Sequence, residues 1–423
     1  MNVLLIGSGA REHALATTIA RSPRLDRLSV APGNAGTADY NVDLEVDNHD
    51  TVVAWCAANA IDLVIVGPEA PLVDGIADVL TNSAIACFGP SAAASRLEGS
   101  KSFSREFAAR AGIPQPVARS FTSSSEAIAW LDEIDFEVVV KADGLAAGKG
   151  VVIPEGRNET EAAIRSMIDD AAFGAASATI VLEERMVGEE LSLFGVSDGT
   201  RVVALTTAQD HKRVGEGDTG LNTGGMGAFA PVPGLDAATE RELTETFLVP
   251  VVDAMAAAGT PYVGVLFAGI MVTDSGPRLV EYNCRFGDPE TEVILPLLAS
   301  DGLELFAAAA QGRLDEVTVE RHALTAATVV VAADGYPTAP RKGVALSLPK
   351  LDRSVQIFHA GTARADDGQL LSNGGRVLAV TGVGDNLDEA LTRSYGAVDQ
   401  LVGDGLFARG DIGWRYSHVR SSR

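Results

Sequence analysis

Apolar runs and helix-like segments alternate through about the first hundred residues, and this alternation limits the possible folds more than any other feature of the chain. The runs "NVLLIG", "LSVAP" and "DLVIVGPEAP" are typical of buried strands, whereas "REHALATTIARS" and "HDTVVAWCAANA" are typical of helices. Strands that alternate with helices predict βαβ units and a parallel sheet. We therefore expect an N-terminal α/β domain over residues 1–98.

The pattern changes beyond this region. A helix over "GSKSFSREFAARAG" should end at Gly112 and Pro114. Strand-like runs such as "FEVVVKAD", "TIVLEERM", "VGVLFAGIMV" and "PRLVEYN" follow, with helices between some of them. After about Leu324 come short strands and one helix, "NLDEALTRSYGAVDQL", which indicate a separate α+β domain. The chain of 423 residues is long enough for such a division, and we expect domains at 1–98, 99–323 and 324–423.

Charge and cysteine usage narrow the classes of partner. The chain has 33 Lys and Arg against 57 Asp and Glu, a net charge of −24. Nucleic acid is therefore not expected as a partner, because binding it requires a basic face. An anionic membrane surface is disfavoured for the same reason. The three cysteines form no CxxC pair, and we find no signal peptide or membrane span, so a cytoplasmic location is expected.

The segment "KADGLAAGKG", residues 141–150, has the composition of a phosphate-binding loop. It is not a Walker loop, because only three residues separate Gly144 from Gly148 and Lys149, and Gly150 has no hydroxyl for magnesium. A glycine-rich loop between two strands can still cover a polyphosphate through its backbone N–H groups. The alternative is a hairpin turn with two solvated lysines.

The segment "LVEYNCRFGDPE" is a candidate metal site. Alternate residues of a strand face the same way, so Glu281 and Asn283 present two oxygen ligands together, as magnesium prefers. Arg285 adds a cation to that face if the strand continues. A polar triplet on an exposed strand is the alternative. Cys284 should face the other way and be buried.

Three further segments suggest ligand contacts. "QDHKRVGEGDTGLNTGGMGAFAP" combines charged residues with many glycines and predicts a ligand-enclosing loop, or else a long surface loop. "VLEERMVGEE" is either a solvated acidic edge or a hinge that meets the base and ribose of a nucleotide. "GSGARE" predicts a tight turn that seats phosphate at a helix N-terminus. Glu12 replaces the third glycine of a dinucleotide fingerprint there, so we do not favour NAD.

The order of these motifs resembles that of the ATP-grasp ligases: Lys101, Lys141 with its glycine loop, the acidic hinge, then Glu-x-Asn. Segments such as "GSGAREHAL", "IVGPEAPL", "LEGSKSF", "KADGLAAGKGV", "QDHKRV", "NTGGMGA", "EYNCRFGDPET", "NGGRVL" and "DIGWR" resemble the phosphoribosylamine–glycine ligase family over nearly the whole chain. The resemblance implies a Rossmann-like N-terminal domain, an ATP-grasp module with a lid over about 121–190, and a small C-terminal α+β domain.

The resemblance also implies roles for individual residues. For ATP it implies Lys101, Lys141, Gly144, Gly148, Lys149, Gly150, the hinge Glu183, Glu184, Arg185 and Met186, and Glu190 at the ribose. Glu281 and Asn283 would hold Mg²⁺ or Mn²⁺. Catalytic roles fall on Arg285, Lys141, Asp210 and Lys212. The substrate site would comprise Gly9, Arg11, Glu12, Pro68, Glu69, Asp210, Lys212, Asn222, Thr223, Gly224, Gly225, Met226 and Arg285.

The implied reaction joins glycine to 5-phosphoribosylamine with ATP in de novo purine synthesis, through a glycyl phosphate, in a monomeric enzyme. Two departures from the family pattern stand out: "LFAGIMV" lacks the acidic metal ligand found in many ATP-grasp enzymes, and Leu221 replaces a proline before "NTGGMG". The alternatives are another ATP-grasp carboxylate–amine ligase or carboxylase, such as a biotin-dependent carboxylase subunit, a nucleotide-binding oxidoreductase, or a non-catalytic nucleotide sensor.

Overall fold

The computed structural model describes residues 1–146 and 149–421. Its N-terminal lobe contains a four-stranded sheet in the order β2-β1-β3-β4, with every pair parallel. The strands are β1 (Asn2–Gly7), β2 (Arg27–Pro32), β3 (Leu63–Val66) and β4 (Ala86–Phe88). The helices are α1 (Ala10–Ile19), α2 (His49–Ala58), α3 (Glu69–Val73), α4 (Ile76–Asn82) and α5 (Ala92–Gly99). The predicted parallel α/β architecture is confirmed.

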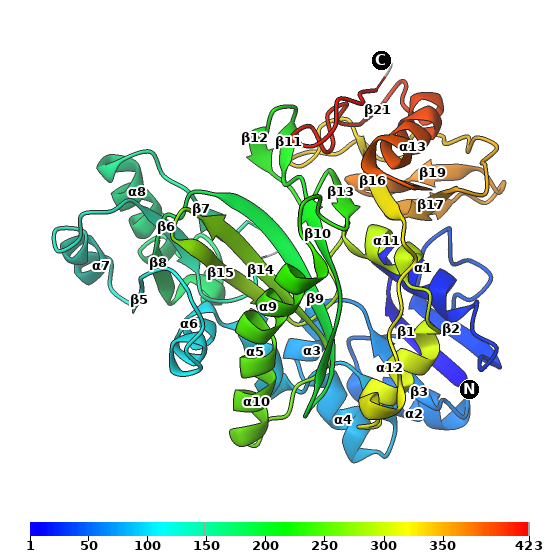
Figure 1. Ribbon diagram of the computed structural model, residues 1–423, viewed down its shortest axis with the longest axis horizontal. Helices are drawn as coiled ribbons and strands as arrows, with labels where there is room; N and C mark the ends of the chain where they lie inside the picture. Colours follow the sequence, from blue (N-terminus) through cyan, green and yellow to red (C-terminus); the bar gives the residue numbers. More distant parts are fainter. Residues whose placement is uncertain (147–148, 422–423) are drawn as a thin grey trace.

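A second lobe projects from the body of the molecule at the left of Figure 1. Its antiparallel sheet has the order β5-β8-β6-β7. The elements are β5 (Ala118–Phe121), α7 (Ser124–Trp130), β6 (Val138–Ala142), β7 (Val151–Val152), α8 (Arg157–Ile168), a 3₁₀ turn (Gly174–Ser177) and β8 (Ile180–Glu184). This lid lobe has its own apolar core, which includes Phe121, Trp130 and Ile164. It reaches the rest of the chain through α6 (Lys101–Arg110), after which Gly112 turns the backbone at φ +71°.

The largest sheet runs from the central segment into the C-terminal one in the order β15-β14-β9-β10-β13-β16-β20-β17, with β21 beside β16. Its central strands are β9 (Glu189–Asp198), β10 (Val202–Asp210), β13 (Gly227–Ala230), β14 (Val263–Thr273) and β15 (Gly276–Asn283). Its C-terminal strands are β16 (Thr325–Ala333), β17 (Val355–His359), β20 (Arg376–Gly384) and β21 (Leu406–Phe407). The pairing of β13 with β16 therefore joins the C-terminal segment to the centre through hydrogen bonds.

Helices flank this sheet in Figure 1. They are α9 (Ala237–Phe247), α10 (Val249–Ala257), α11 (Thr291–Ile294), α12 (Gly302–Ala310) and α13 (Leu387–Leu401), with 3₁₀ turns at Leu295–Leu297 and Leu314–Glu316. One apolar core packs α1, α11 and α12 between the N-terminal sheet and the large sheet, and another lies under α13. The N-terminal lobe and the central sheet are therefore held together by shared apolar packing.

The segment expected to be a ligand-enclosing loop, residues 209–231, is more ordered than the sequence suggested. It forms the hairpin β11 (Arg213–Gly215) and β12 (Thr219–Asn222) before β13. A further small hairpin pairs β18 (Thr362–Arg364) with β19 (Leu370–Ser372). Within the described residues, no helix is both long and apolar enough to cross a membrane.

Candidate active site

Lys141 lies in a buried ion-pair network that joins three parts of the chain. Its side chain is in β6, is only 6% exposed, and places Nζ 2.7 Å from Oε2 of Glu183 in β8. The same carboxylate accepts two hydrogen bonds from Arg105 of α6, at 2.8 and 2.7 Å. Arg105 and Lys141 both also donate to the carbonyl of Val280 in β15. The network fixes Lys141 next to the strand that carries Glu281.

The carboxylates of Glu183 and Glu184 are ion-paired rather than solvated, whereas Glu189 in the same segment is exposed. Burial alone would raise the pKa of Glu183, but Lys141 and Arg105 outweigh it and lower this pKa to about 2. Glu184 pairs with Arg278 of β15 at 2.6 and 2.9 Å. Both carboxylates are already paired with cations. An adenine base bound beside this segment would therefore contact its backbone groups. Arg185 is exposed and Met186 is half-buried.

Lys101 begins α6 and faces the same region. The first turn of α6 is hydrogen-bonded to the "KADG" segment: the Lys101 N–H donates to the Asp143 carbonyl at 3.1 Å, and Lys101 Nζ donates to the Gly144 carbonyl at 3.5 Å. Burial lowers the pKa of Lys101, and Lys141 adds to this effect while Glu281 opposes it. Two lysines therefore converge on one carboxylate, which is the arrangement that a polyphosphate with its metal requires.

The glycine loop connects β6 to β7, which pair as an antiparallel hairpin with Lys141 opposite Val151. The predicted strand–loop–strand order is confirmed. The Gly144 N–H donates to the Ala176 carbonyl at 3.0 Å, and Lys149 is exposed. A side chain at Gly150 would bring its Cβ within 2.7 Å of the Ala146 methyl carbon. Gly148, expected to contact ATP, lies outside the described residues.

Glu281 and Asn283 stand near the end of β15, as the alternation of the strand predicts. Glu281 is half-buried, and among the described residues no group donates a hydrogen bond to its carboxylate or pairs with it within 4 Å. Burial would raise its pKa, yet the lysines 141, 101 and 212 together with Arg285 lower it. The buried Asn283 has Nδ2 without a partner in the described structure.

This donor set fits a magnesium ion. An ionised carboxylate and an amide oxygen suit Mg²⁺, which binds through one or two carboxylates and completes its shell with waters and phosphate oxygens. β14 contains no acidic residue, as its sequence indicated, and it places Gly269 directly opposite Glu281. Glu190 of β9 approaches the same place: a Cβ added to Gly269 would lie 3.7 Å from Glu190 Oε1 and 3.6 Å from Glu281 Cγ.

Arg285 lies beyond the end of β15, because the strand stops at Asn283. The condition that the strand would continue to Arg285 is therefore wrong, yet its guanidinium still donates to Asn283 Oδ1 at 3.3 Å. It pairs with Glu69 at 3.2 Å and Glu98 at 3.1 Å, both from the N-terminal lobe. Pro68 precedes α3 as its N-cap and places Glu69 there. Burial alone would lower the pKa of the Arg285 guanidinium, but Glu98 and Glu69 outweigh burial and raise this pKa.

In the charged run 210–213, the side chains of Asp210 and Lys212 point one way and that of His211 points the other. Lys212 Nζ lies 3.0 Å from Asp210 Oδ1 and 2.8 Å from Glu190 Oε1. Although burial would lower the pKa of Lys212, these two carboxylates raise it well above its usual value, so the lysine stays charged. His211 points the other way and accepts a hydrogen bond from the Gly413 N–H at 3.0 Å. Arg213 donates to the Gly220 carbonyl within its own hairpin.

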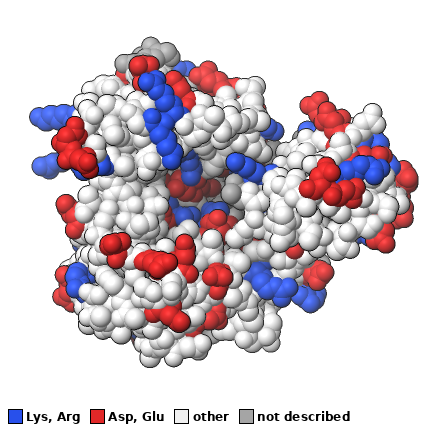
Figure 2. Space-filling view, turned by 180° about the vertical axis from the view of Figure 1, so that it is seen from behind, with Lys and Arg blue, Asp and Glu red and all other residues white. Residues whose placement is uncertain are grey.

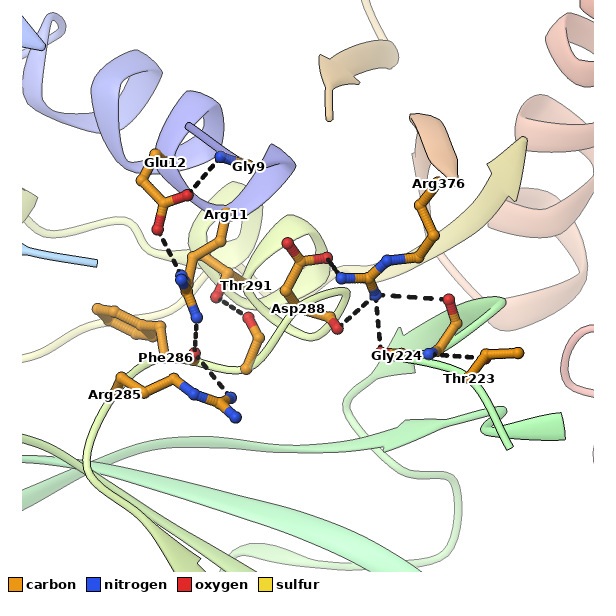
Figure 3. Close-up of polar contacts among 12 residues, drawn as sticks. Gly9, Arg11, Glu12, Thr223, Gly224, Arg285, Phe286, Asp288, Thr291 and Arg376 are labelled. Atoms are coloured by element: carbon orange, nitrogen blue, oxygen red, sulfur yellow. Dashed lines mark hydrogen bonds and ion pairs between the residues drawn. The ribbon is translucent and has the colours of Figure 1, made fainter. Parts of the chain in front are cut away.

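The N-terminal turn holds Glu12 where a dinucleotide fingerprint has glycine. Gly7 has φ +135°, and a Cβ there would lie 2.4 Å from the Glu12 side chain. The Glu12 carboxylate accepts from the Gly9 N–H at 2.6 Å and from Arg11 Nε at 2.6 Å. The Glu12 carboxylate therefore occupies the Gly9 N–H, one of the donors that the predicted phosphate seat would use. Arg11 reaches on to the Phe286 carbonyl at 3.1 Å (Figure 3).

Arg376 of β20 bridges two loops of the candidate site. Its Nη1 donates to the carbonyls of Gly224 and Asp288, each at 2.7 Å, and Nη2 lies 3.0 Å from Asp288 Oδ1 (Figure 3). A Cβ on Gly224 would come within 3.0 Å of the guanidinium carbon, so glycine permits this approach. A residue from the C-terminal segment therefore positions both the "NTGGMG" turn and the "FGDP" segment.

The other residues of that turn differ in their placement. Asn222 is exposed, and Thr223 accepts a hydrogen bond from the Gly225 N–H at 2.9 Å. Thr223 Oγ1 also donates to the Lys212 carbonyl at 2.9 Å. Met226 is fully buried, so its side chain does not line an open site as a substrate residue would.

A hollow opens beside the body of the molecule in the space-filling view (Figure 2). Figure 2 shows acidic and basic side chains at the floor of this hollow. Five residues that interact with the candidate site residues were not singled out from the sequence: Glu98, Arg105, Asp288, Glu290 and Arg376. Asp288, Glu290 and Arg376 belong to the segments "FGDPE" and "NGGRVL", and Arg105 follows Lys101 by one helical turn, so these signals were present.

The three lobes, with two lysines opposing a Glu-x-Asn strand, define an ATP-grasp protein. Family models of phosphoribosylglycinamide synthetase match the chain in three parts: the N domain over residues 1–98, the ATP-grasp (A) domain over 99–291 and the C domain over 326–415. The chain therefore belongs to the phosphoribosylglycinamide synthetase family.

Individual relatives agree with this assignment. A phosphoribosylamine–glycine ligase of Rhizobium meliloti is 50% identical over 418 residues, 98% of each chain, and one of Vibrio parahaemolyticus is 45% identical over 422 residues, again 98% of each. The crystal structure of the Thermotoga maritima phosphoribosylamine–glycine ligase superposes with a TM-score of 0.86 at 33% identity, covering 97% of this chain and 99% of that one.

A biotin carboxylase domain shares the fold. The domain from the Hydrogenobacter thermophilus 2-oxoglutarate carboxylase, crystallised with MgADP and bicarbonate, has a TM-score of 0.75 at 16% identity, over 96% of this chain and 91% of that one. At this identity the similarity establishes the architecture alone. It does not support the carboxylase alternative.

Proposed function

We propose that this protein joins glycine to 5-phosphoribosylamine and forms glycinamide ribonucleotide, ADP and phosphate. The observation that carries the proposal is the electrostatic influence of Lys101 and Lys141 on Glu281, whose carboxylate has no hydrogen-bond or ion-pair partner among the described residues. This arrangement suits a magnesium–polyphosphate complex, and family membership over the whole chain supports glycine and phosphoribosylamine as the other substrates. We also propose a cytoplasmic location and a monomer; the three free, buried cysteines support the location, because they suit a reducing compartment.

The chemistry requires activation of a carboxylate. A glycine oxygen attacks the γ-phosphorus of ATP, ADP leaves, and the amine then attacks the glycyl carbon and displaces phosphate. The protein contributes positioning, charge neutralisation and exclusion of water. Lys101 and Lys141 would hold the phosphates, and Glu281 with Asn283 would hold Mg²⁺ or Mn²⁺, which neutralises developing charge when bound.

Arg285 and Lys212 would stabilise the transferring phosphoryl group and the acyl phosphate. Arg285 is restrained by Glu69 and Glu98, and Lys212 by Asp210 and Glu190, so neither cation needs to reorganise during the reaction. The turn at 223–226 and the segment around Arg11 would shape the phosphoribosylamine site.

Measuring ADP release tests which substrates the enzyme requires. We expect release that requires both glycine and freshly generated phosphoribosylamine, with each omitted in turn. Equal release when bicarbonate replaces glycine would instead support a carboxylase.

The hairpin loop between β6 and β7 should act as a lid. We expect trypsin to cut after the exposed Lys149 in the empty protein, and a non-hydrolysable ATP analogue with Mg²⁺ to suppress this cut strongly, because bound phosphates engage the loop. Lys141, held in its strand, should resist in both states, and the exposed Lys342 should be cut equally in both. Cleavage after Lys149 at the same rate with and without saturating nucleotide would exclude a lid role.

Arg376 should position the phosphoribosylamine side of the site rather than the nucleotide side. Arg376→Met removes bonds of about 1.5–3 kcal/mol to each carbonyl or carboxylate. We expect the KM for phosphoribosylamine to rise about tenfold or more, with the KM for ATP changed less than about twofold. Arg341→Ala, which breaks an exposed pair with Asp404, is the control. A parallel rise in both KM values would show that Arg376 supports the fold generally.

A further inference from the structure

Glu290 is a buried carboxylate beside the candidate site that has no role so far. It precedes α11, is 4% exposed, and accepts a hydrogen bond at Oε1 from Ser192 Oγ of β9 at 3.2 Å. Its Oε2 accepts no hydrogen bond from any other residue in the described parts of the chain. A Cβ on Gly287 would lie 2.4 Å from this oxygen, so the glycine leaves room for the carboxylate.

The charged groups around Glu290 come from several elements. Asp210 and Lys212 act on it from the end of β10, and Arg285 acts from the segment before α11. Glu292 of α11 and Arg376 of β20 also interact with it electrostatically. Two of these neighbours, Lys212 and Arg285, are the cations assigned to the acyl phosphate, and Arg376 orders the amine side. Glu290 is therefore within electrostatic reach of the cations of both half-sites.

Amide formation requires a proton acceptor. The amine nitrogen bonds to the glycyl carbon, the carbon–oxygen bond to phosphate breaks, and the electron pair leaves with phosphate. One proton must then leave the nitrogen. Resting on the proposed function, we propose that Glu290 is a catalytic residue that takes this proton from the attacking amine and afterwards releases it to solvent or to the departing phosphate.

Neighbouring carboxylates are less suited to this step. Asp210 and Glu190 both pair with Lys212, and Asp288 pairs with Arg376. Glu292 is fully buried with both oxygens unpartnered in the described structure, and burial raises its pKa well above the usual value, which disfavours the ionised form that a base requires. Burial and Asp210 raise the pKa of Glu290 to about 7, against the opposing effect of Lys212, and a base of this pKa works well near neutral pH.

Hydroxylamine separates the two half-reactions, because it traps glycyl phosphate as a hydroxamate without the second substrate. In Glu290→Gln we expect glycine- and ATP-dependent hydroxamate formation within about twofold of wild type, and amide formation reduced about a hundredfold or more. Glu292→Gln, in the short helix α11 that follows Glu290, is the matched control and should keep both reactions, because burial already disfavours its ionised form. Equal loss of both reactions in Glu290→Gln, or retained amide formation, would overturn the role of Glu290.

The pH dependence of the wild-type enzyme gives a second measurement that does not depend on a variant folding. Because a base must be ionised, amide formation should fall as pH drops through about 7, whereas hydroxamate formation should lack this limb. An identical acidic limb in both reactions would contradict the proposal. Absence of any glycine-dependent hydroxamate in wild type would instead overturn the proposed function itself.

Discussion

Replacing Glu281 by Gln should lower kcat by about a thousandfold, because a metal-holding carboxylate contributes several kcal/mol in the transition state. The carboxylate makes no hydrogen bond or ion pair among the described residues, so its loss should affect folding far less than turnover. Steady-state kinetics with titrated Mg²⁺ measures the first effect, and urea denaturation measures the second.

The loss of turnover in Asn283→Ala can be compared with that in Glu281→Gln. Asn283→Ala removes a neutral ligand from the same face and should act in the same direction, but more weakly. A Glu281→Gln enzyme with the wild-type rate and normal magnesium dependence would remove Glu281 from the site.

Replacing Glu183 by Ala should lower the free energy of unfolding by about 3–5 kcal/mol, because it leaves the buried Lys141 and Arg105 without a counter-charge. Glu184→Ala is the matched control: its carboxylate also binds an arginine bidentately but is only partly buried, so about 1 kcal/mol or less is expected. Chemical denaturation followed by fluorescence and circular dichroism compares the two. Equal losses of unfolding free energy in the two variants would show that burial does not increase the contribution of this ion-pair network.

The same carboxylate predicts a pH effect. The pKa of Glu183 is lowered to about 2 in the folded protein, against about 4.3 in an unfolded chain. Its stabilising contribution is therefore complete above the unfolded value and is lost as pH falls from there towards about 2. In Glu183→Ala this part of the acid dependence of unfolding should disappear.

Local patterns predicted much of the fold. Strand alternation placed Glu281 and Asn283 on one face, and helix and strand signals located α1, α2, α6 and α13. These features depend on short-range periodicity, which a single sequence records directly. The parallel N-terminal sheet followed from the same alternation.

Long-range pairing could not be predicted in this way. Arg105 binds Glu183, and Arg376 binds Asp288 and Gly224, across separations that no local pattern encodes. The continuation of the central sheet through β13 and β16 likewise depends on strand pairing between distant segments. The contact between Glu12 and the Gly9 N–H is local, but it depends on the side-chain conformation of Glu12, which the residue pattern at the first turn does not specify.

The ligation of glycine is tested by following oxygen from its carboxylate to phosphate. Glycine labelled with ¹⁸O in its carboxylate should transfer a single labelled oxygen to each phosphate released, because the carboxylate attacks phosphorus and its carbon–oxygen bond later breaks. We predict this transfer only when ATP and phosphoribosylamine are both present, with the second labelled oxygen retained in the amide product. Phosphate released during turnover without label, or turnover that continues without glycine, would contradict the proposed ligation.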